Sequence, residues 1–276
     1  MNQAPGLILV TTDGSAHSRR VLPHAAAFAL ARGDRIALLQ VVDDAQAEAA
    51  ALAHNGTALR NEGIDGTPLT TTKREDESVP RAIVRVATEQ GATMIAMDTR
   101  GHGAIHHAIH GSTALEVLAL TELPVFLTGA ELSDAQATEP YRIVITTDGS
   151  SASRDVMRAL SPLLTPGSFA VTLLQVQERN PDAAAEAAQV AAVEAQLNSE
   201  RHFFMEGLDV QCKVREIARL GGVDTAIIEE ARELRAHCIA MSSHGTSAQR
   251  HLFAGSTALQ LLGRSPLPVI MARGAE

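Results

Sequence analysis

Two glycine-containing segments of the chain carry the residue types best suited to bind a ligand. Each opens with a glycine and, after nine intervening residues, ends in Gly-Ser-Thr: Gly101, Gly111, Ser112 and Thr113 in one copy, and Gly245, Gly255, Ser256 and Thr257 in the other. A glycine loop that leads into a helix N-terminus gathers unpaired backbone N–H groups at the positive end of the helix dipole, where phosphate binds readily. The two copies, 144 positions apart, therefore predict two phosphate sites.

The flanking sequence predicts the elements that would position these loops. Residues 94–97 and 238–241, just upstream, are apolar runs with the length and hydrophobicity of buried strands. Downstream, each copy has a threonine followed three residues later by Glu or Gln, which is the capping-box pattern of a helix start. The predicted caps are Thr113 and Thr257.

With the threonines acting as caps, the hydroxyl groups of Ser112 and Ser256 remain available to donate to a phosphate oxygen. For one copy alone, a Gly-Ser pair that merely carries a loop into a helix is an equally good explanation. The duplication at matched positions favours a ligand.

Length and composition favour two domains and exclude several classes of partner. The chain has 276 residues, of which 45% are hydrophobic, enough for one large or two ordinary cores. Its net charge of -9 supplies no positive field for nucleic acid. No apolar run approaches the roughly 20 residues of a membrane-spanning helix, and the first residues lack the basic region of a signal peptide. We expect a cytoplasmic protein without a nucleic-acid or membrane partner.

The two cysteines, Cys212 and Cys238, are spaced for neither a disulfide framework nor a zinc site. Both lie in apolar sequence without an obvious cationic neighbour, so we expect inert core thiols.

An internal duplication runs through the chain. The motif Thr-Thr-Asp-Gly-Ser follows an apolar run at Asp13 and again at Asp148, an offset of 135 residues. A second apolar run contains Leu-Leu-Gln-Val in both halves, at Val41 and Val176, with the same offset. The repeat settles the choice in favour of two domains.

The offset then grows from 135 to 144, so the second half holds nine additional residues. We expect them to lengthen a helix predicted at 183–205 by roughly 13 Å. The corresponding region, residues 44–62, is shorter and interrupted by Asn55-Gly56.

Apolar strand patterns alternate with amphipathic helix patterns, five strands in each half. This alternation predicts an α/β fold with two tandem, doubly wound, five-stranded parallel-sheet domains, at 1–130 and 140–276, joined by the polar linker 129–139. The last strands, which begin at Pro124 and Pro268, could pair within one molecule and relate the domains by a pseudo-twofold axis. Association of two chains into a homodimer stays open.

These features resemble the universal stress protein family in a tandem form that covers nearly the whole chain. The Thr-Asp-Gly-Ser turn, the final Pro-Val strand and the glycine loop of each half carry the resemblance. ATP-binding members of that family have Gly, two residues, Gly, nine residues, Gly and then Ser or Thr. Both loops match this pattern except at its first glycine, which is replaced by Asp98 and Ser242.

The resemblance implies an adenine nucleotide alpha hydrolase-like fold and an adenine nucleotide ligand, ATP, ADP or AMP, with or without Mg²⁺. It implies that Asp13 and Asp148 lie against the adenosine, and that the backbones of Val41 and Val176 contact the adenine edge. The phosphates would lie against the loop residues: Gly101, Gly111, Ser112 and Thr113 in the first half, and Gly245, Gly255, Ser256 and Thr257 in the second. Alternatively, each aspartate only closes a turn through an Asx-type bond, and the valines are core residues.

The residue that replaces the first glycine differs between the two halves. Ser242 is small and can donate a hydrogen bond, so the second site is compatible with a nucleotide. Asp98 puts a carboxylate where phosphates should lie, and like charges at that range cost on the order of one to several kcal/mol. Either the first site is empty or weak, which we favour, or Asp98 helps to hold a Mg²⁺ that bridges to the phosphates.

Histidines crowd the first loop at spacings that metal ligands use: His102, His106, His107 and His110. Among them, only His107 has a histidine counterpart in the second loop, His251. Basic residues beside a phosphate site explain this loop adequately, and we assign no metal site.

Three functional hypotheses follow. The first is a stress-response regulatory protein that binds an adenine nucleotide, with domain 2 favoured over domain 1. The second is a universal stress protein that binds no nucleotide and acts through its surfaces and dimerisation. The third, an enzyme, is the weakest, because the chain lacks a P-loop and a Gly-x-Gly-x-x-Gly fingerprint and groups no catalytic residues. At most we expect a weak ATPase.

Overall fold

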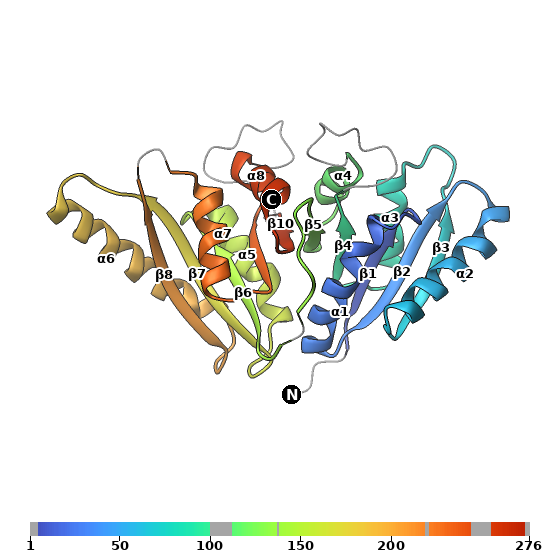
Figure 1. The fold of residues 1–276 in the computed structure, drawn as a ribbon, viewed down its shortest axis with the longest axis horizontal. Helices are drawn as coiled ribbons and strands as arrows, with labels where there is room; N and C mark the ends of the chain where they lie inside the picture. The colour runs from blue at the N-terminus through green and yellow to red at the C-terminus, as the bar shows by residue number, and fades with distance from the viewer. Residues whose placement is uncertain (1–4, 100–111, 137, 219–220, 244–254, 274–276) are drawn as a thin grey trace.

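The computed structural model describes residues 5–99, 112–136, 138–218, 221–243 and 255–273. Within them, ten strands form one sheet in the order β3-β2-β1-β4-β5-β10-β9-β6-β7-β8. The second half of this order mirrors the first. Figure 1 shows the two halves side by side, with β5 and β10 at the centre.

The first half contributes five parallel strands: β1 (Leu7–Thr12), β2 (Arg35–Val42), β3 (Gly66–Thr72), β4 (Met94–Asp98) and β5 (Val125–Thr128). A short 3-10 helix and four α-helices connect them: η1 (Ser18–Arg20), α1 (Val21–Arg32), α2 (Ala45–Asn61), α3 (Val79–Glu89) and α4 (Ser112–Leu120).

The second half repeats the arrangement with β6 (Tyr141–Thr146), β7 (Phe169–Glu178), β8 (Asp209–Ile217), β9 (Cys238–Ser242) and β10 (Val269–Ala272). Its helices are α5 (Ser151–Leu160), η2 (Ser161–Leu163), α6 (Ala183–Glu200), η3 (Arg201–Phe203), α7 (Val223–Glu233) and α8 (Ser256–Arg264). We refer to the halves as domain 1 and domain 2.

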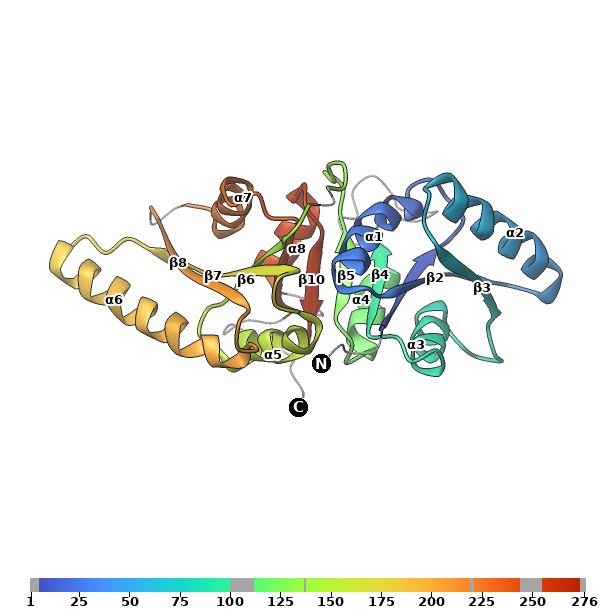
Figure 2. The same ribbon diagram turned by 90° about the horizontal axis from the view of Figure 1, so that it is seen from below.

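Helices cover both faces of the sheet in each domain. In domain 1, α1 and α2 pack on one face and α3 and α4 on the other; in domain 2, α5 and α6 oppose α7 and α8 (Figure 2). Alternate strand residues supply the two cores, since Ile8 and Val10 belong to one cluster and Leu7 and Leu9 to the other. The predicted doubly wound architecture is therefore confirmed.

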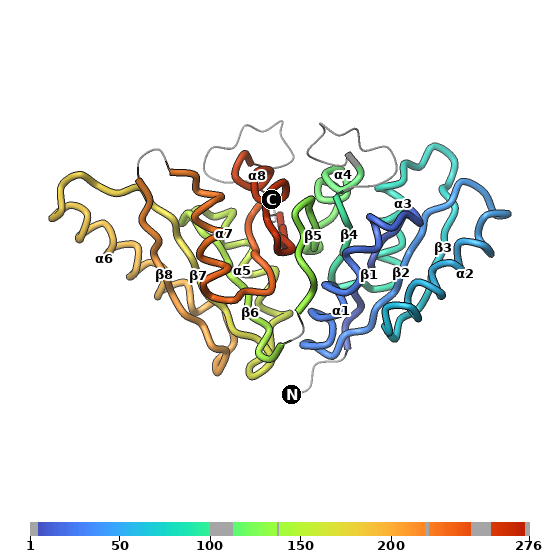
Figure 3. The backbone as a smooth tube through the Cα atoms, viewed as in Figure 1, coloured from blue at the N-terminus to red at the C-terminus, as the bar shows by residue number. Residues whose placement is uncertain are grey.

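The expected pairing of the last strands is also confirmed. β5 and β10 run antiparallel, with Val269 opposite Leu127 and Met271 opposite Val125. The backbone trace in Figure 3 shows the two halves meeting along this pair. The two sheets are thereby joined into one, with the pseudo-twofold relation that the sequence predicted.

An aromatic cluster fills the interface beside these strands. Phe28 of α1 packs against Tyr141 and Phe169 of domain 2, with ring centroids 5.4 Å away in both cases. Phe126 of β5 lies 6.1 Å from the same ring. All four rings are almost fully buried, so this cluster contributes strongly to holding the domains together.

The linker is attached to both domains. Arg20 of domain 1 donates to the carbonyl of Leu132, and His24 Nε2 donates to the carbonyl of Ser133 over 3.0 Å. Ser133 in turn donates, through its backbone N–H and its hydroxyl, to the carbonyl of Pro266 in domain 2. The linker therefore forms part of the interface.

The prediction about the nine additional residues is wrong. Helix α2 has 17 residues and α6 has 18, so only one of the nine lengthens the helix. Most of the others lie in the loop before α6 and in the segment 201–208 after it. The predicted interruption at Asn55-Gly56 is also wrong, because the buried Asn55 amide donates to the carbonyls of Leu38 and Leu69 and fastens α2 to the sheet.

None of the helices in the described part of the chain is long and apolar enough to cross a membrane.

Replacing Gly129 with alanine should destabilise the protein. A Cβ at this position would lie 1.9 Å from the backbone oxygen of Leu262 in α8, which cannot move away without shifting the helix. We expect a loss of about 1–3 kcal/mol in the free energy of unfolding, the usual cost of overpacking, measured by urea denaturation.

The matched control is Gly56→Ala. There the nearest atom is the flexible end of Arg60, 3.4 Å away, within a helix. Alanine in a helix interior gains up to about 1 kcal/mol over glycine, so this variant should be no less stable than the wild type. Equal stability of the two variants would show that Gly129 is not closely packed.

The stability of the domain interface should depend on pH through His24. Burial lowers the pKa of His24 to about 4, and nearby Arg20 adds to the effect, although the Ser133 carbonyl and Asp134 oppose it. In the unfolded chain the His24 imidazole becomes protonated near pH 6.5, whereas in the folded protein it stays neutral down to about pH 4. The free energy of unfolding is therefore highest above pH 6.5 and decreases as the pH falls toward 4. Between about pH 7.5 and pH 5 the loss should reach about 2 kcal/mol.

The measurement compares urea denaturation of the wild type and His24→Gln at these two pH values. Glutamine can still donate to the Ser133 carbonyl but does not titrate, so the variant should lose about 2 kcal/mol less than the wild type over this interval. Parallel losses in the two proteins would contradict the assignment to His24.

Candidate functional site

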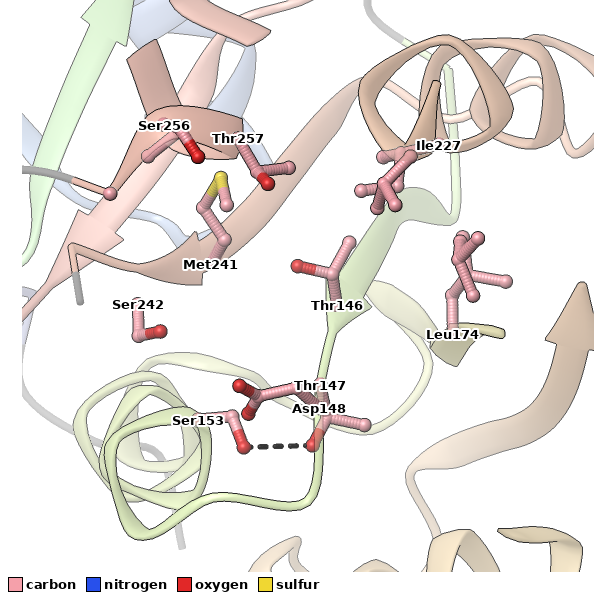
Figure 4. Close-up of a pocket in the computed structure, with 14 residues that line it drawn as sticks. Thr146, Thr147, Asp148, Ser153, Leu174, Ile227, Met241, Ser242, Ser256 and Thr257 are labelled. Atoms are coloured by element: carbon pink, nitrogen blue, oxygen red, sulfur yellow. Dashed lines mark hydrogen bonds between the residues drawn. The ribbon is translucent and has the colours of Figure 1, made fainter. Parts of the chain in front are cut away.

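A cavity of about 210 Å³ opens in domain 2 at the carboxyl ends of β6 and β9 (Figure 4). Strand β6 pairs with β7 on one side and with β9 on the other. The chain runs from β6 outward to β7 and β8, and then crosses back to β9 on the opposite side of β6. The cavity therefore lies at the point where strand order reverses, which is the usual ligand position in an open α/β sheet.

The turn after β6 forms one side of the cavity. The hydroxyls of Thr147 and Ser153 are 2.8 Å apart, and the Gly149 N–H donates to Thr147 Oγ1. Asp148 Oδ1 accepts from the Ser150 N–H over 3.0 Å, which is the Asx-type bond. Asp148 thus has the turn role considered as an alternative, and it also lines the cavity.

Domain 1 repeats this turn. Thr12 and Ser18 hydroxyls are 2.7 Å apart, the Gly14 N–H donates to Thr12 Oγ1, and Asp13 Oδ1 accepts from the Ser15 N–H over 2.9 Å. The Thr-Thr-Asp-Gly-Ser motif, with a serine three residues beyond its end, therefore encodes one hydrogen-bonded turn twice. The paired hydroxyls of threonine and serine were not predicted, although this repeated spacing was visible in the sequence.

Apolar side chains form another side of the cavity. Leu174 and Val176 come from β7, Val223 and Ile227 from α7, and Met241 from β9. Val176 was singled out in the sequence, whereas the α7 residues were not, because their approach depends on how the helix packs. In domain 1, Val41 occupies the matching position in β2 and is half-buried against the core.

The N-terminus of α8 closes the cavity. Gly255 is the N-cap and makes no side-chain cap bond, and the helix begins at Ser256. Ser256 and Thr257 both line the cavity, and Figure 4 shows their hydroxyls on its side. Gly255 therefore supplies no side-chain bond to the first N–H groups of this helix, which lie beside the cavity at the place where anions bind to helices.

The prediction that Thr113 and Thr257 cap their helices is wrong. Helices α4 and α8 begin at Ser112 and Ser256, so each threonine is already the second helical residue. A residue with helical backbone angles cannot turn its side chain back onto the N–H groups of the next turn, as an N-cap does.

Gly255 leaves open room at this helix start. Among the described residues, the atom that a Cβ there would meet is the Ser243 carbonyl oxygen, at 3.9 Å, and the residue has no left-handed φ that would require glycine. Packing among the described residues therefore does not demand a glycine here.

Several predicted site residues lie outside the described residues: Gly101, Gly111 and Gly245, together with His102, His106, His107, His110 and His251. Ser112 is described only as the first residue of α4. Their proposed roles stay predictions.

The two domains differ where the family pattern has its first glycine. Asp98, 9% exposed, ends β4, and Thr128 Oγ1 donates to its Oδ2 over 2.7 Å. In domain 2 the corresponding paired residues are Ser242 and Ala272. Domain 1 therefore has a buried carboxylate at the position where domain 2 has a small hydroxyl group.

Neither cysteine of the chain is a reactive thiol. Burial raises the pKa of the Cys238 thiol to about 12 and also raises that of Cys212, which keeps both in the unreactive thiol form. No group of three or more His, Cys, Asp or Glu side chains within the described ranges could hold a metal ion.

The fold and the repeated turns match a known family. The sequence model described as the universal stress protein family matches residues 6–128 and 141–273. The chain belongs to the universal stress protein family and contains two tandem domains of it. A search of curated proteins found no significant match.

Solved structures of similar length support the same fold. A universal stress protein from Archaeoglobus fulgidus DSM 4304 superposes with a TM-score of 0.68 at 18% identity, over 99% of this chain and 100% of that one. A functionally unknown protein from Pseudomonas aeruginosa PAO1 gives a TM-score of 0.65 at 17% identity, over 98% and 93%. At these identities the likeness defines the fold alone.

A universal stress protein of about half the length, solved in complex with cAMP, covers 50% of this chain and 100% of its own, with 18% identity and a TM-score of 0.36.

Proposed function

We propose that this stress-response protein binds an adenine nucleotide, ATP, ADP or AMP, in domain 2, and that occupancy regulates its interactions with partners. The observation that carries the proposal is the cavity at the β6–β9 reversal point, bounded by the N-terminus of α8. Membership of the universal stress protein family supports the same ligand class.

The two sides of the cavity suit the two ends of a nucleotide. Val176, Ile227 and Leu174 provide an apolar surface for a base. Ser256 and Thr257 provide hydroxyl donors beside the N–H groups that begin α8, where a phosphate gains charge-assisted hydrogen bonds. Asp148, at the turn between them, is proposed to contact the ribose.

The volume bears on which nucleotide is bound. About 210 Å³ is below the 300–1,000 Å³ typical of pockets that enclose a whole ligand. The cavity therefore favours a ligand that is enclosed in part and reaches solvent in part. Comparison of AMP, ADP and ATP identifies which phosphates contribute.

Domain 1 is proposed to bind nucleotide weakly or not at all. Its Asp98 carboxylate is buried and fixed by Thr128 at the place where the family pattern has a glycine. We also propose Asp13, Val41 and Thr113 as the domain 1 counterparts of the binding residues, and expect them to act only when this charge is removed.

Thermal unfolding with added AMP, ADP or ATP tests the domain 2 site. At a hundredfold excess over Kd the ligand should stabilise the protein by about 2.7 kcal/mol, or a rise in Tm of about 5 °C. Gly255→Val should abolish the rise, because its side chain fills the space beside the α8 N-terminus, while leaving the Tm without ligand nearly unchanged.

Inorganic triphosphate is the ligand control. It should stabilise the protein less than ATP, because it cannot contact Val176 and Ile227. Absence of any nucleotide response in the wild type would reject the proposal in favour of a universal stress protein that acts only through its surfaces, and an equal response from Gly255→Val would place the site elsewhere.

The effect of the Asp98 charge on nucleotide binding by domain 1 is tested in the Gly255→Val variant, in which domain 2 is expected to bind no nucleotide. Asp98→Asn retains an oxygen that can accept from Thr128 but removes the charge. Nucleotide affinity should rise about tenfold, corresponding to about 1.4 kcal/mol, as measured by isothermal titration calorimetry. Unchanged affinity would show that the Asp98 charge does not weaken this site.

A further inference from the structure

A second cluster of polar side chains lies in domain 2, away from the nucleotide cavity. Helix α6 packs across β7 and β8 at the outer end of the sheet, far from the β5–β10 pair (Figure 1). Gln177 and Glu216 stand near the carboxyl ends of these strands, and Glu186 is in the first turn of α6.

The strand register brings these side chains onto one face. Gln177 and Glu216 are directly paired between β7 and β8. Alternate residues before them, Leu173 in β7 and Val210 in β8, share the core cluster that contains Leu197 of α6. Because side chains two residues apart in a strand point the same way, Gln177 and Glu216 face α6. Glu186 lies against Glu216.

Each of these three side chains has a buried oxygen without a hydrogen-bond partner: Gln177 Oε1, Glu186 Oε1 and Glu216 Oε1. Gln177 is only 8% exposed. Among the described residues, Arg179 forms an ion pair with this group: its Nε lies 4.0 Å from Glu186 Oε1, and its side chain is 68% exposed. Two carboxylates and an amide oxygen therefore lie together, and within the described ranges the ion-pair partner is the largely exposed Arg179.

Such an arrangement is costly unless something satisfies the oxygens together. A proton shared between Glu186 and Glu216 would join two of them and leave Gln177 Oε1 unpartnered. A hard cation can coordinate all three oxygens, since Mg²⁺ and Ca²⁺ prefer carboxylate, amide carbonyl and water oxygens as ligands. We propose that Gln177, Glu186 and Glu216 form a binding site for a hard divalent cation, with water completing its coordination.

The duplication provides an internal comparison. At the place of the Gln177–Glu216 pair, domain 1 has the register pair Val42–Thr72. The helix residue is kept, because Glu48 is the fourth residue of α2 as Glu186 is of α6. Domain 1 thus retains one carboxylate without the other two ligands, so the site belongs to domain 2 alone.

Isothermal titration calorimetry tests the site on the full chain, freed of metal with EDTA and without nucleotide. MgCl₂ and CaCl₂ are titrated separately, and the stronger response identifies the cation. The wild type should bind one equivalent in a saturable manner, and binding should raise its Tm. Glu186→Gln and Glu216→Gln should each weaken binding about tenfold or more, since carboxylate charge sets the affinity of such sites.

Two further variants make the test specific. Glu48→Gln changes the matching residue of domain 1 and should leave cation binding unaltered. Gln177→Val introduces the residue that domain 1 carries in the same fold position, so it should fold normally and bind the cation more weakly.

Two results would overturn the proposal. One is the absence of cation binding by the wild type. An unchanged or raised Tm for Glu186→Gln would then indicate that a shared proton and the Gln177 amide nitrogen satisfy the carboxylates. The other is cation binding that survives in Glu186→Gln, Glu216→Gln and Gln177→Val, which would place the cation elsewhere.

Discussion

Antiparallel hydrogen bonding between β5 and β10 is the interaction on which the rest of the molecule depends. Each strand would be the edge of its own five-stranded sheet, and an unpaired edge invites association with other chains. Paired together, both strands are completely buried, and the aromatic cluster around Phe28 covers the junction. Within one chain this contact forms without the entropy cost of bringing two molecules together.

The same interface supports the two helices that follow the glycine loops, α4 and α8. Gly129, just beyond β5, packs on the backbone of Leu262 in α8, and Arg273, just beyond β10, donates to the carbonyl of Ala119 near the end of α4. Each helix that follows a glycine loop is therefore held at its C-terminal end by the other domain. The proposed ligand at the start of α8 would therefore contact an element that both domains position.

Duplication has kept the architecture while the chemistry of the halves has diverged. The turns after β1 and β6 share the Thr–Ser hydroxyl contact and the bonds that the glycine and serine N–H groups donate to Thr and Asp, because these bonds lead each strand into its helix. Positions that face a ligand rather than the core are free to change. Asp98 against Ser242 changes the proposed nucleotide site, and Val42 against Gln177 changes the outer edge of the sheet. These exchanges explain how a chain with one repeated fold can hold unlike sites.

Local pattern and repetition in the sequence were sufficient to predict the strands, most helices, the tandem architecture and the β5–β10 pairing. The repeated glycine loop identified Gly255, Ser256 and Thr257, and the family resemblance added Asp148 and Val176. The structure brings all five to one cavity. Helix boundaries were less certain: the capping-box pattern misplaced the start of α8, and Asn55 holds α2 intact through bonds to two strands. Only the tertiary structure decided how α7 closes the cavity and how Gln177, Glu186 and Glu216 converge, because those contacts join residues that no local periodicity relates.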